Sequence, residues 1–119
     1  MDMLISIKPE FLDRIRDGTK RFEFRKKRHI KEIRFMVFYA TSPVKKIAGY
    51  TKIKRILVGH KDCIWQNTQQ YAGILKSCYS DYFKTKDLAV AYELDKSVFF
   101  TKQYSFDDLN LDIVAPQSY

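Results

Sequence analysis

The chain has little of what small metal-binding or disulfide-stabilised domains are built from. It contains only two cysteines, Cys63 and Cys78, and neither belongs to a CxxC or Cys/His pattern. His29 and His60 lie far apart in the sequence, so the usual spacing of a zinc site is missing. The carboxylates form no cluster suited to a metal. We therefore expect two buried free thiols, no metal and no cofactor.

Long apolar runs are missing as well. No N-terminal segment has the apolar length of a signal peptide, and no segment approaches the roughly 20 residues of a membrane-spanning helix. The chain also lacks repeats and low-complexity linkers. A chain of 119 residues with 45% hydrophobic residues is long enough to form a core without cross-links. We expect a single domain over residues 1–119, cytoplasmic and without membrane contact.

Basic residues, in contrast, are abundant and unevenly placed. Residues 1–61 carry 17 basic and 6 acidic side chains, whereas residues 62–119 carry 5 and 8. Eleven of the 22 lysines and arginines lie between Lys8 and Arg34. Cations that neutralise phosphates release condensed counterions, so this asymmetry favours RNA or a nucleotide as the partner, with DNA left open. The alternative is a soluble domain that is merely basic.

The first 25 residues predict a strand, a helix and a second strand. Met3–Ile7 is a short apolar strand, and Pro9 suits the first turn of a helix whose apolar residues recur at helical spacing until Gly18 ends it. From residue 20 to residue 25 the period becomes two, with aromatic side chains on one face and charged side chains on the other.

The rest of the chain predicts further strands with helices between them. Residues 33–40 are β-branched and aromatic, as in a buried strand. Gly49 interrupts a long strand region, where a bend or bulge would let a sheet curl. The later segments are a strand region at 46–58, helical stretches at 62–84, and strands at 89–94 and 98–104. We predict the α+β class: a small mixed β-barrel of about five or six strands with two or three helices, with a flat open sheet as the alternative.

Several motifs, in this order, resemble the ASCH domain, which belongs to the PUA-like superfamily. They are Ser6-Ile7-Lys8-Pro9, Gly18-x-Lys20-x-x-Glu23-x-Arg25, Tyr39-Ala40-Thr41-Ser42-Pro43, Gly49, and Tyr82-Phe83 followed by Ala89-x-Ala91-Tyr92. The resemblance covers about residues 3–109 and leaves 110–119 as a C-terminal tail. It implies a PUA-like pseudo-barrel with a cleft beside the first helix, and roles in RNA binding, RNA processing or modified-nucleoside chemistry.

Nine residues are candidates for binding a single-stranded or flipped base and its backbone in this basic cleft. They are Lys8, Lys20, Glu23, Arg25, Lys26, Lys27, Tyr39, Ser42 and Tyr82. Cations meet phosphates, a carboxylate accepts a base N–H, and an aromatic ring stacks on a base. The alternatives are a solvated turn for the lysines, a surface ion pair for Glu23 and a core position for Tyr82. The basic turn at 25–28 would add affinity without selectivity.

Three hypotheses of function stay open. The leading one is an RNA-binding module in RNA processing or regulation of transcription or translation. The second is an enzyme, a ribonuclease or amidohydrolase, with Lys20 and Glu23 as its acid/base pair. In the ASCH proteins that hydrolyse N4-acetylcytidine, a nucleophilic threonine follows the catalytic lysine by three residues; Glu23 stands there in this chain, and Asp81 is the candidate for their distant acid. The third is a protein-interaction domain. The oligomeric state is not indicated.

Overall fold

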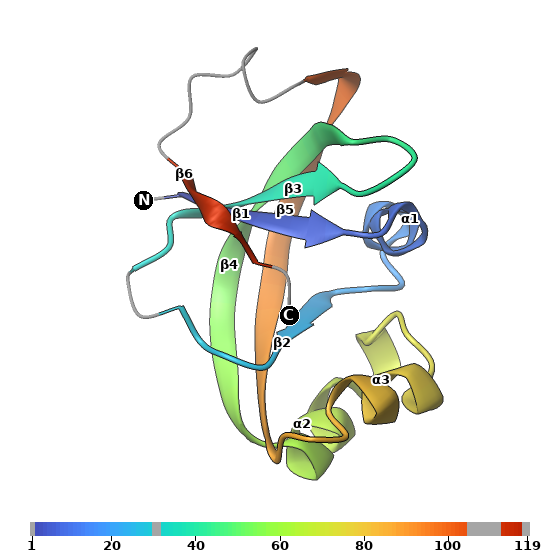
Figure 1. Cartoon of the computed structure of the whole chain (residues 1–119), viewed down its shortest axis with the longest axis vertical. Helices are drawn as coiled ribbons and strands as arrows, with labels where there is room; N and C mark the ends of the chain where they lie inside the picture. Colours follow the sequence, from blue (N-terminus) through green and yellow to red (C-terminus); the bar gives the residue numbers. More distant parts are fainter. Residues whose placement is uncertain (1, 30–31, 105–112, 118–119) are drawn as a thin grey trace.

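The first strand, helix and second strand form where the hydrophobic pattern predicts them. The computed structural model describes residues 2–29, 32–104 and 113–117 (Figure 1). Strand β1 spans Asp2–Ile7, and helix α1 spans Pro9–Asp17 and ends at Gly18, whose φ is 87°. Strand β2 spans Phe22–Arg25. All four residues of β2 are buried, so its charged face does not point into solvent.

Two long strands and a helical insertion between them make up most of the remaining chain. The elements are β3 (Phe35–Ala40), β4 (Lys46–His60), α2 (Lys61–Thr68), the 3₁₀ turn η1 (Gln69–Tyr71), α3 (Lys76–Tyr82), β5 (Leu88–Tyr104) and β6 (Ile113–Gln117). The separate strands predicted at 89–94 and 98–104 are one strand, because the chain bends at Lys96 (φ 55°) and pairing with β4 resumes beyond it. Strand β6 lies in the segment that we assigned to a tail.

The strands form one mixed, curled sheet in the order β2-β5-β4-β3-β1-β6. Strand β1 pairs in parallel with β3 and β6, whereas the pairs among β2, β3, β4 and β5 are antiparallel. The predicted irregularity at Gly49 is present: the register shifts beside it, and a Cβ there would lie 2.1 Å from the carbonyl oxygen of Val98. The long β4–β5 pair curves along its length in Figure 1, so the sheet is a curled half-barrel. The predicted α+β fold with a small mixed β-barrel is confirmed over the alternative of a flat open sheet.

The helices cover two different parts of this sheet. Helix α1 packs Leu12 and Ile15 into the largest core, together with β1, β3 and the middle of β5. Helices α2 and α3 lie at the end of the β4–β5 pair and pack against β2 through a second core that contains Phe24 and Tyr79 (Figure 1). Among the described residues, no helix is long and apolar enough to cross a membrane.

The expectation of buried thiols is wrong, because Cys63 and Cys78 are both exposed. Each cysteine directly precedes a buried residue of its helix, Ile64 in α2 and Tyr79 in α3. Neighbouring residues point about 100° apart around a helix, so a short helix that buries one of them turns the other toward solvent.

Candidate functional site

A cleft of about 420 Å³ opens between α1 and α3, over the edge of β2 that pairs with no other strand of the described chain. Figure 1 shows the two helices on opposite sides of the end of β2. The lining residues are Ser6, Ile7, Lys8, Glu10, Phe11, Lys20, Glu23, Phe24, Arg25, Ile74, Cys78, Asp81 and Tyr82. Three of them are basic and three are acidic, so the charge of the lining is balanced, and the predicted basic character is not a property of its walls.

Lys20 lies at the floor of the cleft, with 2% of its surface exposed. Its backbone N–H donates to the carbonyl of Arg14 at 3.0 Å, and its Nζ donates to the carbonyl of Ala72 at 2.9 Å. Removal from water lowers the pKa of Lys20 below its usual 10.5, against the opposing effect of Glu23. Lys20 is therefore not the solvated turn lysine of the alternative reading.

Gly73 makes room for this lysine. A Cβ at Gly73 would lie 2.2 Å from the Cβ of Lys20, and the φ of Gly73 is +67°. Its carbonyl accepts a 2.6 Å hydrogen bond from Arg14, which ties α1 to the segment after η1. Gly73 was not predicted as a site residue; it is one of four glycines in the chain, and the sequence offers no other sign of its role.

Glu23 is 6% exposed and joins the two buried cations of the cleft. Its Oε1 accepts a hydrogen bond from the backbone N–H of Phe24 at 3.2 Å. The same oxygen lies 3.6 Å from Arg25 and 3.9 Å from the Nζ of Lys20. No described residue bonds its other oxygen, Oε2. The reading of Glu23 as half of a surface ion pair is therefore wrong.

Arg25, which is 8% exposed, caps the same strand edge. It donates to the carbonyls of Phe24 and Ser6, both at 3.0 Å. Together with Glu23 it occupies the free N–H and C=O of Phe24, so β2 does not offer a bare edge to another strand. Its Nε is buried and has no hydrogen-bond partner in the described chain.

Arg21 does not belong to the cluster of Lys20, Glu23 and Arg25, although the period of two predicts that it lies on the same strand face as Glu23 and Arg25. Its guanidinium lies 3.9 Å from the centre of the Tyr71 ring, and its backbone N–H donates to the carbonyl of Tyr71 at 2.8 Å. Lys20 takes its place beside Glu23 because regular strand geometry begins only at Phe22.

Tyr82 closes one side of the cleft. The ammonium of Lys26 lies 4.7 Å from its ring centre, so one face of the ring already carries a cation. Burial raises the pKa of Tyr82, so its hydroxyl remains a donor at neutral pH. This hydroxyl is buried near Arg25 and Lys26, but within the described chain it forms no hydrogen bond of good geometry. The neighbouring Phe83 is fully buried.

The structure brings some predicted residues together and separates others. Lys8 is exposed at the rim, where it precedes α1, and Asp81 lines the opposite rim in an ion pair with Lys84. Four predicted residues do not line the cleft: Lys26, Lys27, Tyr39 and Ser42. Tyr39 packs on the other side of β3 because its neighbours Phe38 and Ala40 fill the core beneath α1.

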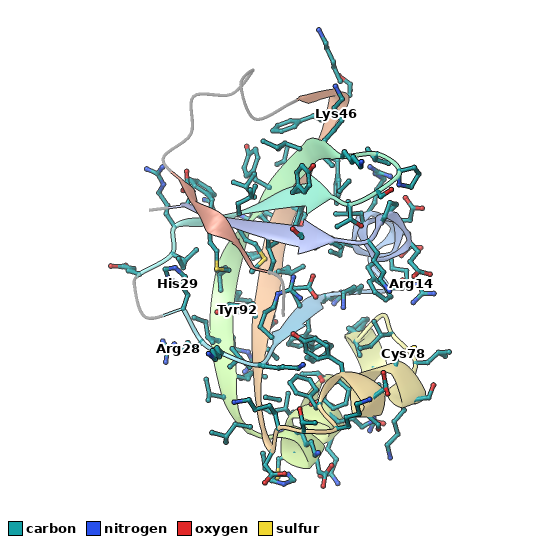
Figure 2. All side chains as sticks on the ribbon, in the orientation of Figure 1. Arg14, Arg28, His29, Lys46, Cys78 and Tyr92 are labelled. Atoms are coloured by element: carbon teal, nitrogen blue, oxygen red, sulfur yellow. The ribbon has the colours of Figure 1, made fainter. Side chains whose placement is uncertain are left out.

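The basic turn leads away from the cleft. Figure 2 shows Arg28 and His29 on the loop that follows β2, on the other side of the view from Cys78 of α3. Of the predicted turn residues 25–28, Arg25 lines the cleft and Lys26 contacts it through Tyr82. The described residues also contain no group of three side chains placed to hold a metal ion.

Apolar residues of the lining were not predicted as site residues. Phe11 and Phe24 were read only as members of a helix and a strand core, yet the Nζ of Lys20 lies 5.6 and 5.1 Å from their ring centres. Ile74 completes the apolar wall. The sequence pattern gives no sign of this use, because a residue that packs into a core and one that borders a cleft follow the same periodicity.

Comparison with known proteins gives one family from both sequence and structure. A family model described as ASCH domain matches residues 5–97. A protein of Zymomonas mobilis subsp. mobilis named "ASCH domain-containing ribonuclease" is 31% identical over 94 residues, which cover 78% of this chain and 64% of that protein. The match therefore spans a little under two thirds of that relative.

Solved structures agree. The crystal structure of ASCH from Zymomonas mobilis has a TM-score of 0.79 at 28% identity and covers 87% of this chain and 73% of that chain. A mutant of the Zymomonas mobilis protein gives 0.81 at 27% identity, with coverage of 90% and 78%. A hypothetical protein at 21% identity has a TM-score of 0.58, covers 82% of this chain and 100% of that chain, and shares the fold. Because the family model spans most of the chain and every residue that lines the cleft, this protein belongs to the ASCH domain family.

Proposed function

We propose that this protein binds single-stranded RNA and holds one unpaired nucleotide in the cleft between α1 and α3. The observation that carries this proposal is the buried cluster of Lys20, Glu23 and Arg25 at the floor of a cleft whose walls include apolar side chains. Placing three charged groups out of water costs free energy, and binding sites are where such costs recur.

The size and chemistry of the cleft suit a base better than a chain of phosphates. A volume of about 420 Å³ lies within the ~300–1,000 Å³ of small-molecule pockets. Since the charge of the lining is balanced, the cleft gains little electrostatic free energy by binding a polyanion. Its polar groups can bind the edge of a base, and its apolar side chains can pack on the faces of the base. Phosphate contacts are left to exposed cations at the rim of the cleft and beyond it, which include Lys8 at the rim and Lys27 farther away.

Binding is tested with a labelled single-stranded RNA and fluorescence anisotropy. We expect Lys20→Met to weaken binding at least tenfold, because the charge cluster loses its geometry. The matched control is Lys54→Met, which removes an exposed lysine of β4 that pairs with Glu93. We expect this control to lose no more than about threefold, and the affinity of the wild type to fall with salt. Equal losses in both variants would mean that the cleft takes no part in binding.

A second candidate activity is cleavage of the bound RNA. The name of the Zymomonas mobilis relative and the lowered pKa of Lys20 support this activity. In this proposal the Glu23 carboxylate takes the proton of a 2′-hydroxyl, whose oxygen then attacks the adjacent phosphorus. The bond from phosphorus to the 5′-oxygen breaks, and the Lys20 ammonium gives that oxygen a proton. The products are a 2′,3′-cyclic phosphate and a 5′-hydroxyl.

Lys20→Arg separates cleavage from binding. A guanidinium keeps the positive charge but does not give up a proton near neutral pH, so we expect cleavage to fall at least a hundredfold while RNA affinity stays within about fivefold. Product ends are identified by mass spectrometry, and a 2′-deoxynucleotide at the cut site is the substrate control. Cleavage by Lys20→Arg at the wild-type rate would exclude Lys20 as the acid, and a wild type without product would restrict the protein to binding.

A further inference from the structure

A second pocket, of about 250 Å³, lies beside the cleft, and we call it the basic pocket. Its lining includes Arg16, Lys20, Arg21, Lys96 and Ser97. Four of the described residues that line it are basic and none is acidic, whereas the cleft has three of each. Lys20 lines both pockets, so they are neighbours. The basic pocket therefore offers an anion the net positive charge that the cleft lacks.

Aromatic rings support the two arginines of the basic pocket. The guanidinium of Arg16 lies 4.6 Å from the centre of the Phe99 ring, and the guanidinium of Arg21 lies 3.9 Å from the centre of the Tyr71 ring. A guanidinium that lies over a ring keeps N–H groups at its edge, which can bind a phosphate with two parallel hydrogen bonds. Arg16 also pairs with Asp13 at 3.1 Å. Over the ranges that the structure describes, no carboxylate pairs with Arg21.

A bulge in β5 brings a third exposed cation to this pocket. Between Asp95 and Val98, two residues of β5 lie opposite the single residue Thr51 of β4. These two residues are Lys96, whose φ is 55°, and Ser97. The buried hydroxyl of Thr51 donates to the carbonyl of Asp95 at 3.1 Å and so fixes the bulge. Neighbours on a regular strand point to opposite faces, but the bulge lets Lys96 and Ser97 line the same pocket.

We propose that the basic pocket binds a backbone phosphate of the RNA whose nucleotide occupies the cleft. The inference rests on the proposed RNA binding and adds the site that anchors the strand beside the cleft. Arg21 and Lys96 supply positive charge, and the Ser97 hydroxyl can donate to a phosphate oxygen. Because Lys20 borders both pockets, this phosphate lies close in the strand to the nucleotide in the cleft. A phosphate contact carries no sequence information, so the pocket raises affinity for all sequences alike.

The test compares Lys96→Gln with the matched control Lys86→Gln, which removes an exposed lysine from the loop before β5, outside both pockets. The ligand is a short labelled single-stranded RNA whose 2′-O-methyl sugars prevent cleavage, and fluorescence anisotropy gives its affinity at several salt concentrations. We expect Lys96→Gln to lose about five- to tenfold in affinity at low salt. The slope of log affinity against log salt concentration should become shallower by about one, because one phosphate contact is lost.

The control Lys86→Gln should lose no more than about twofold, with the slope of the wild type. Equal losses and equal slopes in the two variants would overturn the phosphate site and leave RNA binding intact. No binding of RNA by the wild type would overturn both proposals. A thermal melt of each variant confirms folding.

An RNA analogue with neutral methylphosphonate linkages separates a phosphate contact from damage to the cleft. The analogue keeps its bases, so it can still enter the cleft, but it offers no charged phosphate to the basic pocket. We expect the wild type and Lys96→Gln to bind it within about twofold of each other. If the loss in Lys96→Gln persisted with the neutral analogue, Lys96 would act through the cleft and the proposal would be wrong.

Discussion

Two clusters of one carboxylate and two cations lie on neighbouring strands of this protein, in opposite surroundings. Glu93 of β5 pairs with Lys54 and Arg55, whose side chains are 63% and 60% exposed. Glu23 of β2 pairs with Lys20 and Arg25, whose side chains are 1% and 9% exposed. Water screens the charges of the first cluster, whereas hydrogen bonds to backbone carbonyls hold the cations of the second. The second cluster therefore combines weak screening with backbone anchoring, as recognition requires.

The largest difference between the clusters should appear when each loses its carboxylate. Glu23→Leu leaves two buried cations without a counter-charge and the N–H of Phe24 without an acceptor, so we expect a loss of about 3–5 kcal/mol in the free energy of unfolding. Glu93→Leu leaves two cations that water already solvates, and we expect at most about 1 kcal/mol. Urea denaturation of the two variants measures both values. Similar losses would show that the burial of the first cluster has no energetic consequence.

The second prediction concerns the support of the buried cluster. Gly73→Ala adds a Cβ 2.2 Å from the Cβ of Lys20 at a φ of +67°, and we expect a loss of about 2–4 kcal/mol. Gly18→Ala is the matched control, because the φ of Gly18 is +87° but no atom lies within 4 Å of the added Cβ. Its backbone strain alone should cost about 1 kcal/mol. The additional loss of unfolding free energy in Gly73→Ala measures the cost of the contact with Lys20. Equal losses in the two variants would show that this contact has no energetic cost.

Most of the fold could be predicted from the sequence because its signals are local. Helix α1 begins at Pro9 and ends before Gly18, as these residue types predict, and Gly49 lies at the irregularity of β4. Strand β6 and the continuity of β5 could not be predicted, since both depend on pairing partners distant in sequence. Local pattern describes the elements, but not which of them lie side by side.

The candidate site could be predicted only in part, for the same reason. The period of two placed Glu23 and Arg25 on one face, but it could not show that this face is buried, because α1 and α3 close over it from different parts of the chain. The contact between Lys20 and Gly73 crosses more than fifty residues and leaves no mark on the pattern of either segment. For Tyr39 the prediction placed a residue in the cleft that lies elsewhere: its side chain is on the other face of the sheet.

The smallest expected effect is a dependence of stability on pH that we expect of the Glu23 cluster and not of the Glu93 cluster. Lys20 has its pKa lowered by burial, so between that lowered pKa and 10.5 the unfolded chain binds a proton that the folded chain does not. Stability due to Lys20 therefore rises with pH across this interval, by at most about 1.4 kcal/mol per pH unit. We expect urea denaturation between pH 7 and pH 10 to show the free energy of unfolding of the wild type rising relative to that of Lys20→Met. Lys54→Met changes the net charge equally, and a profile that diverged from the wild type in the same way would attribute the effect to overall charge rather than to burial.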